Sequence, residues 1–115
     1  MAKIECELYG DFDEILEQLN NAVLEGSVSA TLEEFSDFVT PDMQCAVRAY
    51  ERYSWTGSSR VSLNITLIQS SGRIFLSAVS TGGCQAVFYK VNTIGEENFL
   101  STVEWVADMY SSDDV

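Results

Sequence analysis

The chain has 115 residues, enough for one domain with a core of its own. Its 18 acidic and 6 basic residues give a formal charge of −12, which disfavours nucleic acids and anionic membranes as partners because both are negatively charged. No apolar run approaches the roughly 18 residues that a membrane span needs, and the start MAKIECELYG lacks the apolar core of a secretory signal. We therefore expect a cytoplasmic protein.

The residue types that build common catalytic and metal sites are scarce. The chain contains no histidine, and its three cysteines, Cys6, Cys45 and Cys84, form no CxxC pair. This composition disfavours a disulfide framework, a zinc site and a hydrolase that uses histidine as its base. We accordingly expect no enzyme activity, no catalytic residue, no cofactor and no metal.

The first third of the chain predicts a strand, a helix and a second strand. Residues 3–8 alternate between apolar and charged side chains, as in a half-buried strand. Residues 12–25 change to helical spacing, with Asp11 as a capping residue and Gly26 as the stop. Residues 28–32 alternate again, and the only proline, Pro41, marks a loop or bend.

From Met43 to Val91 the alternation is nearly continuous, and three polar breaks divide it into four antiparallel strands. Pairing Tyr53 with Ser59, and placing turns at Ser71-Gly72 and Gly82-Gly83, collects one apolar set on a common face. Since a strand is predicted after Gly82-Gly83, we interpret that pair as a hairpin turn and not as a phosphate-binding loop. The face that we expect to form the core carries Cys45, Val47, Ala49, Leu63, Ile65, Leu67, Ile74, Leu76, Ala78, Val87, Tyr89 and Val91.

A second helix is predicted over residues 92–110. It begins at a capping box, Thr93 with Glu96, and continues with apolar residues at helical spacing. Residues 111–115 read as a frayed acidic tail. The chain therefore predicts a single α+β domain over residues 1–110, in the order β-α-β-(four-strand antiparallel meander)-α, with the helices on one face of a curved antiparallel sheet.

The opposite face of the predicted meander carries two groups of interest. One is an apolar patch of Ile68, Phe75, Val79 and Phe88, which we expect to be buried against a second copy or another partner. The other is a candidate anion site of Arg48, Tyr50, Arg52 and Arg60, for which the simpler interpretation is neutralisation by nearby acids.

The same register places Cys84 on the outer face as an accessible thiol. With no histidine in the chain and no basic residue close in the register, nothing lowers its pKa, so we interpret it as structural or incidental.

The order of elements resembles the helix-grip arrangement shared by the TATA-binding-protein-like and Bet v 1-like folds. Three segments, GDFDEILEQLNNAVLEGSVSA, CAVRAYERYSWTGSSRVSLNITL and STGGCQAVFYKVNTIGEENFL, resemble an uncharacterised family of small bacterial proteins of unknown function. The resemblance covers nearly the whole chain and implies a bacterial cytosolic origin. It implies no activity, ligand or catalytic residue.

These observations lead to two functional hypotheses. The first is a non-catalytic binding or assembly module, expected to form a homodimer through the outer sheet face. The alternative is a carrier or sensor of a small apolar ligand held between the C-terminal helix and the inner face, against which the large inner side chains argue. The expected partners are thus a second copy, an unidentified protein or a small ligand, and not nucleic acid or membrane.

Overall fold

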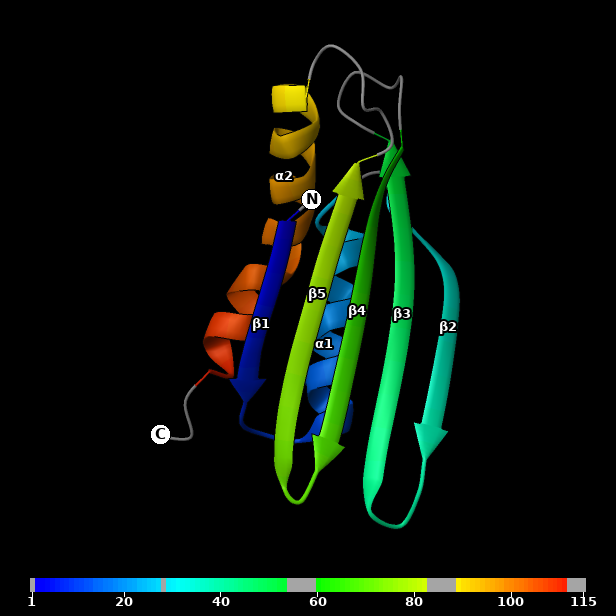
Figure 1. Cartoon of the computed structure of the whole chain (residues 1–115), viewed down its shortest axis with the longest axis vertical. Helices are drawn as coiled ribbons and strands as arrows, with labels where there is room; N and C mark the ends of the chain where they lie inside the picture. Colours follow the sequence, from blue (N-terminus) through cyan, green and yellow to red (C-terminus); the bar gives the residue numbers. More distant parts are fainter. Residues whose placement is uncertain (1, 28, 54–59, 83–88, 112–115) are drawn as a thin grey trace.

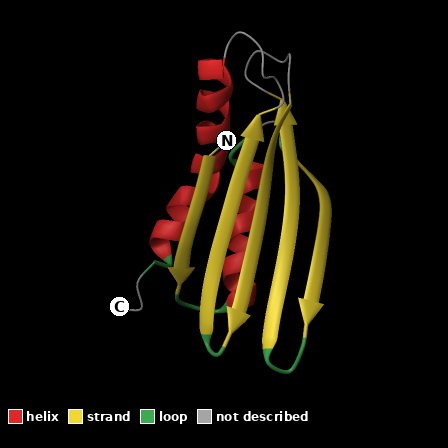
Figure 2. Ribbon diagram, in the orientation of Figure 1, coloured by secondary structure: helices red, strands yellow, loops and turns green. Residues whose placement is uncertain are grey.

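The computed structural model describes residues 2–27, 29–53, 60–82 and 89–111, with the backbone alone between residues 89 and 98. Five strands form one antiparallel sheet in the order β1-β5-β4-β3-β2, and both helices lie on the same face of it (Figures 1 and 2). The predicted α+β class is confirmed. The elements are β1 (Ala2–Leu8), α1 (Phe12–Glu25), β2 (Thr31–Val39), β3 (Met43–Tyr53), β4 (Arg60–Ser70), β5 (Arg73–Gly82) and α2 (Tyr89–Met109).

Helix α1 begins and ends where the sequence predicts. The Asp11 carboxylate accepts a hydrogen bond of 3.0 Å from the backbone N–H of Glu14, which satisfies one of the free donors of the first turn. At the other end the N–H of Gly26 donates to the carbonyl of Ala22 over 2.9 Å. The buried side of the helix carries Phe12, Ile15, Leu19, Ala22 and Val23.

Strands β4 and β5 form the centre of the sheet with the predicted register. Leu67 lies opposite Leu76, and Ile65 lies opposite Ala78. Their turn, Ser71-Gly72, has positive φ angles of 55° and 76°, the backbone that a tight two-residue hairpin requires. The inner side chains of both strands are buried beneath the helices: Val61, Leu63, Ile65, Leu67, Ile74, Leu76, Ala78 and Ser80.

The predicted strand after β5 is wrong where the structure describes it, because α2 begins at Tyr89 and includes Val91. The physical reason is that β1 pairs with β5 along all of Ala2–Leu8 and so occupies the sheet edge that a further hairpin would need. The observed meander is β2-β3-β4-β5. Gly82 pairs with Val61 inside β5, and residues 83–88, with the rest of the predicted turn, lie outside the described residues.

Strand β3 is turned over relative to the prediction. Tyr53 pairs with Arg60 instead of Ser59, and this shift of one residue exchanges the two faces of the strand. Ala46 and Tyr50 are therefore buried at 1% exposure, whereas the predicted core residues Cys45, Val47 and Ala49 lie half-buried on the outer face.

The physical reason is that long amphipathic side chains can occupy an inner face when their polar ends reach partners. The Tyr50 hydroxyl donates a hydrogen bond to Asn20, the Arg48 guanidinium donates one to Asp37, and the Arg52 guanidinium donates one to Ser27. The inward-facing side chains of β3 thus supply apolar surface to the core, while their polar ends are hydrogen-bonded.

Strand β2 extends to Val39, well beyond the predicted end at residue 32, and forms one edge of the sheet. The pairing with β3 shifts by one residue between Leu32 and Glu34, as at a β-bulge. Each of its nine residues is exposed, because the helices cover the other strands and leave β2 open on both faces (Figure 1).

Neither helix in the described part of the chain combines the length and apolarity that a membrane crossing requires.

Candidate functional site

A row of four apolar side chains crosses the outer face, the side of the sheet opposite the helices. Phe38 of β2 lies opposite Cys45 of β3, Cys45 opposite Ile68 of β4, and Ile68 opposite Phe75 of β5. Directly opposite residues in an antiparallel pair point to the same face, so the four side chains are neighbours. We call Phe38, Cys45, Ile68 and Phe75 the outer row. Phe38 is 58% exposed and Phe75 is 43% exposed.

The surroundings of the outer row are uncharged along its length and charged at its end. The next row consists of Ser36, Val47, Thr66 and Ser77. Beyond Phe75, the register continues to Glu7 of β1, which accepts hydrogen bonds of 3.0 and 2.8 Å from Arg73. These bonds lower the pKa of the Glu7 carboxyl. A hollow of about 340 Å³ lies between this ion pair and the side chains of Ile68 and Phe75.

Three of the four predicted interface residues lie within the described part of the chain. Ile68, Phe75 and Val79 share the outer face, with Val79 two rows from the outer row, while Phe88 lies outside the described residues. Sequence reasoning missed Phe38, because the strand was expected to end at residue 32, and missed Cys45, because β3 was placed the other way round. The aromatic and β-branched residues Phe35, Phe38 and Val39, which precede Pro41, are the signal that could have extended β2.

The candidate anion residues do not gather on one face. Arg48, Tyr50 and Arg52 lie on the inner face of β3, whereas Arg60 lies on the outer face, where it pairs with Glu51. The Arg48 guanidinium donates over 2.9 Å to both the Asp37 carboxylate and the Val47 carbonyl. This is the arrangement that neutralisation by nearby acids predicts.

Arg52 and Tyr50 connect β3 to the helices. The Arg52 guanidinium lies over the ring of Phe99 of α2, 4.6 Å from its centroid, and burial lowers its pKa. The Tyr50 hydroxyl donates a 2.7 Å hydrogen bond to Asn20 Oδ1 of α1. Burial raises the pKa of Tyr50 to about 12, with Arg48 acting weakly in the opposite direction.

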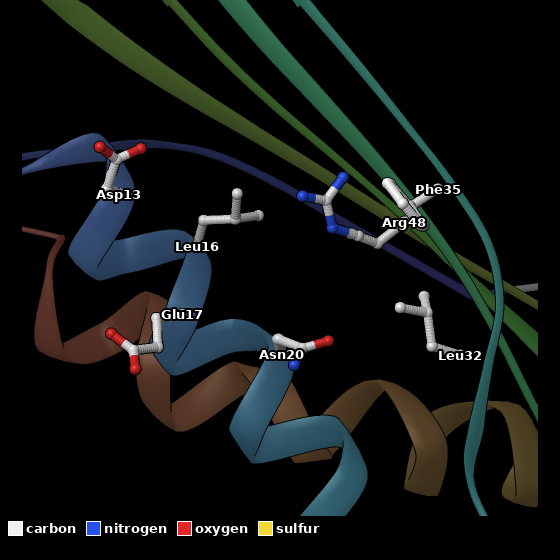
Figure 3. Close-up of a pocket in the computed structure, with 7 residues that line it drawn as sticks. All are labelled: Asp13, Leu16, Glu17, Asn20, Leu32, Phe35 and Arg48. Carbon is white, nitrogen blue, oxygen red and sulfur yellow. The ribbon is translucent and has the colours of Figure 1, made fainter.

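A groove separates α1 from β2 on the inner face (Figure 3). It has a volume of about 310 Å³, and its apolar surface comes from Leu16, Leu32 and Phe35. Leu32 is 37% exposed and Phe35 is 58% exposed, so these side chains lie open to solvent. Two carboxylates from exposed positions of α1, Asp13 and Glu17, also line it, together with Asn20 and Arg48. Nothing in the sequence interpretation anticipated this groove, since the predicted strand ended at residue 32, before Phe35.

The two cysteines within the described residues lie on opposite faces. Cys6 lies opposite Leu76 on the inner face, where burial and the nearby Asp108 carboxylate raise the pKa of its thiol. Cys45 belongs to the outer row, and both are free thiols. Cys84, the predicted accessible thiol, lies outside the described residues. The described side chains contain no group of three His, Cys, Asp or Glu residues that could hold a metal ion.

Comparison with known proteins places the chain in a family without assigning it an activity. No curated protein matches the sequence at a significant level. The model of a family described as "Family of unknown function (DUF6054)" matches residues 1–111, nearly the whole chain. The chain therefore belongs to the DUF6054 family of unknown function.

Proposed function

We propose that this chain is a non-catalytic assembly module that associates with a second copy of itself through the outer face of the sheet. The observation that supports the proposal is the outer row, in which four apolar side chains from four strands lie side by side. No described helix covers this face (Figure 2). Contiguous exposed apolar surface of this kind is typical of interaction sites.

The distribution of charge favours self-association through this face despite the net charge of −12. The outer row and the row beside it carry no charged residue on β2 to β5. The charged groups stand at the margin, as in the Glu7–Arg73 and Glu51–Arg60 pairs. An apolar centre with a polar rim is the usual composition of a protein interface, and sheets commonly pack face to face.

The carrier hypothesis would need space between α2 and the inner face. Phe99, Val103 and Val106 of α2 are fully buried there at 0% exposure, against equally buried side chains of β4 and β5. No observation on the described residues favours a ligand cavity at that position, so we propose no second function.

The test is the substitution Phe75→Glu, followed by sedimentation velocity at micromolar protein concentrations. We expect the unmodified chain to sediment as a dimer and Phe75→Glu to shift it toward the monomer, because the new carboxylate would be buried without a partner. The far-UV circular dichroism spectrum should not change, since Phe75 lies outside the monomer's core.

Trp105→Glu is the matched control. Trp105 is an apolar side chain of α2 with 52% exposure, so this variant has the same net charge and loses a comparable aromatic surface elsewhere. It should remain dimeric. A monomeric unmodified chain, or equal dissociation in the two variants, would refute assembly through the outer row.

A further inference from the structure

The outer edge of β2 has the properties of a docking edge for another strand. Within the described residues β2 pairs with β3 alone, so the backbone N–H and C=O groups that point away from β3 have no strand partner. A long exposed edge strand with apolar side chains is a ready template for strand addition. Phe35 and Phe38, each 58% exposed, flank this edge on the inner and outer faces respectively.

The charges around this edge are predominantly acidic. The strand itself carries Glu33, Glu34 and Asp37. Across the groove, α1 adds the exposed carboxylates of Asp13 and Glu17. Among the described residues that line the groove, Arg48 is the one cation; Asp37 already binds it, and it lies 5.2 Å from the centroid of the Phe35 ring.

This charge pattern favours one kind of binding partner over another at the β2 edge. A second copy pairing β2 with β2 would bring two acidic strands together, and like charges on directly opposed strand positions are destabilising. A basic segment would instead meet opposite charges on the strand and across the groove. The net charge of −12 attracts such a segment from a distance as well.

We propose that the β2 edge binds an extended, basic segment of a partner protein, which adds to the sheet as a sixth strand. Side chains of an added strand alternate between the two faces of the sheet. Those on the inner face lie over the groove, where lysine or arginine stems cover Leu32 and Phe35 while their charged ends reach Asp13 and Glu17. Those on the outer face lie beside Phe38, where apolar residues extend the outer row.

The proposed partner segment therefore has a defined pattern, in which a basic residue alternates with an apolar one. This inference rests on the β2 edge and the inner groove, and it shares only Phe38 with the surface proposed for self-association.

The probe is a fluorescently labelled, end-capped peptide of ten residues in which lysine alternates with valine. Its affinity is measured by fluorescence anisotropy, and the backbone amides that it protects are located by hydrogen exchange. We expect binding, with protection of amides in Thr31–Val39. A peptide with glutamate in place of lysine should not bind, and one with an N-methyl group on every residue should bind far more weakly, because it keeps the charge but cannot donate the strand hydrogen bonds.

Two charge-reversal variants separate local recognition from general attraction. Glu17→Lys changes the groove, whereas Glu104→Lys makes the same change of net charge at an exposed position of α2. We expect the peptide to bind Glu17→Lys about three- to tenfold more weakly than Glu104→Lys. The Phe75→Glu variant should bind the peptide as tightly as the unmodified chain, since the β2 edge is intact.

Three results would overturn the proposal. Equal affinity of the two charge-reversal variants would show that net charge alone attracts the peptide. Undiminished binding of the N-methylated peptide would exclude strand addition. Protection of the β2 amides that rises with the concentration of the Phe75→Glu variant, in the absence of peptide, would show that a second copy occupies the edge.

Discussion

Tyr50 lies at 1% exposure between β3 and α1, with its hydroxyl bonded to Asn20. The ring supplies apolar contact area and the hydroxyl finds a partner, so the residue acts as part of the core although it ends in a polar group. Its phenolate form would lose hydration in this position. For that reason the pKa of Tyr50 is raised to about 12.

This shift predicts a loss of stability at high pH. An unfolded tyrosine titrates near pH 10, so the unfolded state releases the proton first as the pH rises. The contribution of Tyr50 to the free energy of unfolding is fully present below about pH 10 and is lost progressively as the pH approaches about 12. After allowance for solvent screening of the hydroxyl, the loss from this residue is on the order of 1–2 kcal/mol.

The variant Tyr50→Phe should remove this part of the pH dependence. At pH 7 it should lower the free energy of unfolding by about 1 kcal/mol through the lost hydrogen bond to Asn20. Urea unfolding at a series of pH values measures both effects. Tyr53→Phe, at a 55% exposed position of the same strand, is the control and should leave both unchanged. Identical pH profiles for the two variants would contradict the assignment.

At the scale of the element, α1 shows how local interactions define a helix boundary. Asp11 has extended backbone angles of −89° and 128°, and its carboxylate accepts the N–H of Glu14. The first turn also places Asp13 and Glu14 near the positive end of the helix dipole. These interactions involve residues within one turn, which is why the sequence alone predicts them.

Removal of the cap should destabilise the protein by a small, measurable amount. Asp11→Ala leaves the N–H of Glu14 without its side-chain acceptor and should lower the free energy of unfolding by about 1 kcal/mol. Asp11→Asn keeps an oxygen acceptor and should cost much less. Chemical denaturation of both variants measures the two changes in the free energy of unfolding. If asparagine costs as much as alanine, the charge of Asp11 and not its cap stabilises the helix.

At the scale of the whole molecule, the two faces of the sheet have different roles. The inner face is filled by the helices, and the outer face is left open among the described residues (Figure 1). Two cysteines allow the exposure of each face to be measured, because Cys45 belongs to the outer row and Cys6 faces inward toward Asp108 of α2.

Thiol labelling in a Cys84→Ser background tests both the strand orientation and the assembly. In dilute protein, Cys45 should react faster than Cys6, whose raised pKa and position under α2 suppress its thiolate. At higher protein concentration the reaction of Cys45 should slow, because self-association covers the outer row, whereas the rate of Cys6 should not change. The substitution Phe75→Glu should abolish the concentration dependence.

Two results of this experiment would contradict the orientation of β3 or the proposed dimer. Faster labelling of Cys6 would mean that β3 presents the other face. A Cys45 rate that is independent of protein concentration in the unmodified chain would contradict burial of the outer row in a dimer.

Features that depend on neighbours along the chain can be predicted from the amino-acid sequence: the period and caps of α1, and the paired register of β4 and β5 across a two-residue turn. The sequence also identified Ile68, Phe75 and Val79 as members of one outer face, since alternation within β4 and β5 was unambiguous. These features rest on local periodicity, turn chemistry and capping, all of which a single sequence displays.

Other features of the fold depend on contacts between distant parts of the chain. Whether β3 buries Val47 or Tyr50 depends on Asn20 and Asp37, which come from α1 and β2 and offer partners to the polar ends. Whether residues 89–91 form strand or helix depends on β1, which occupies the edge of β5. The outer row and the groove depend on the face that β3 buries and on the extension of β2 to Val39. The buried face of β3 and the edges of the sheet are set by partners distant in the chain, so local patterns do not define them.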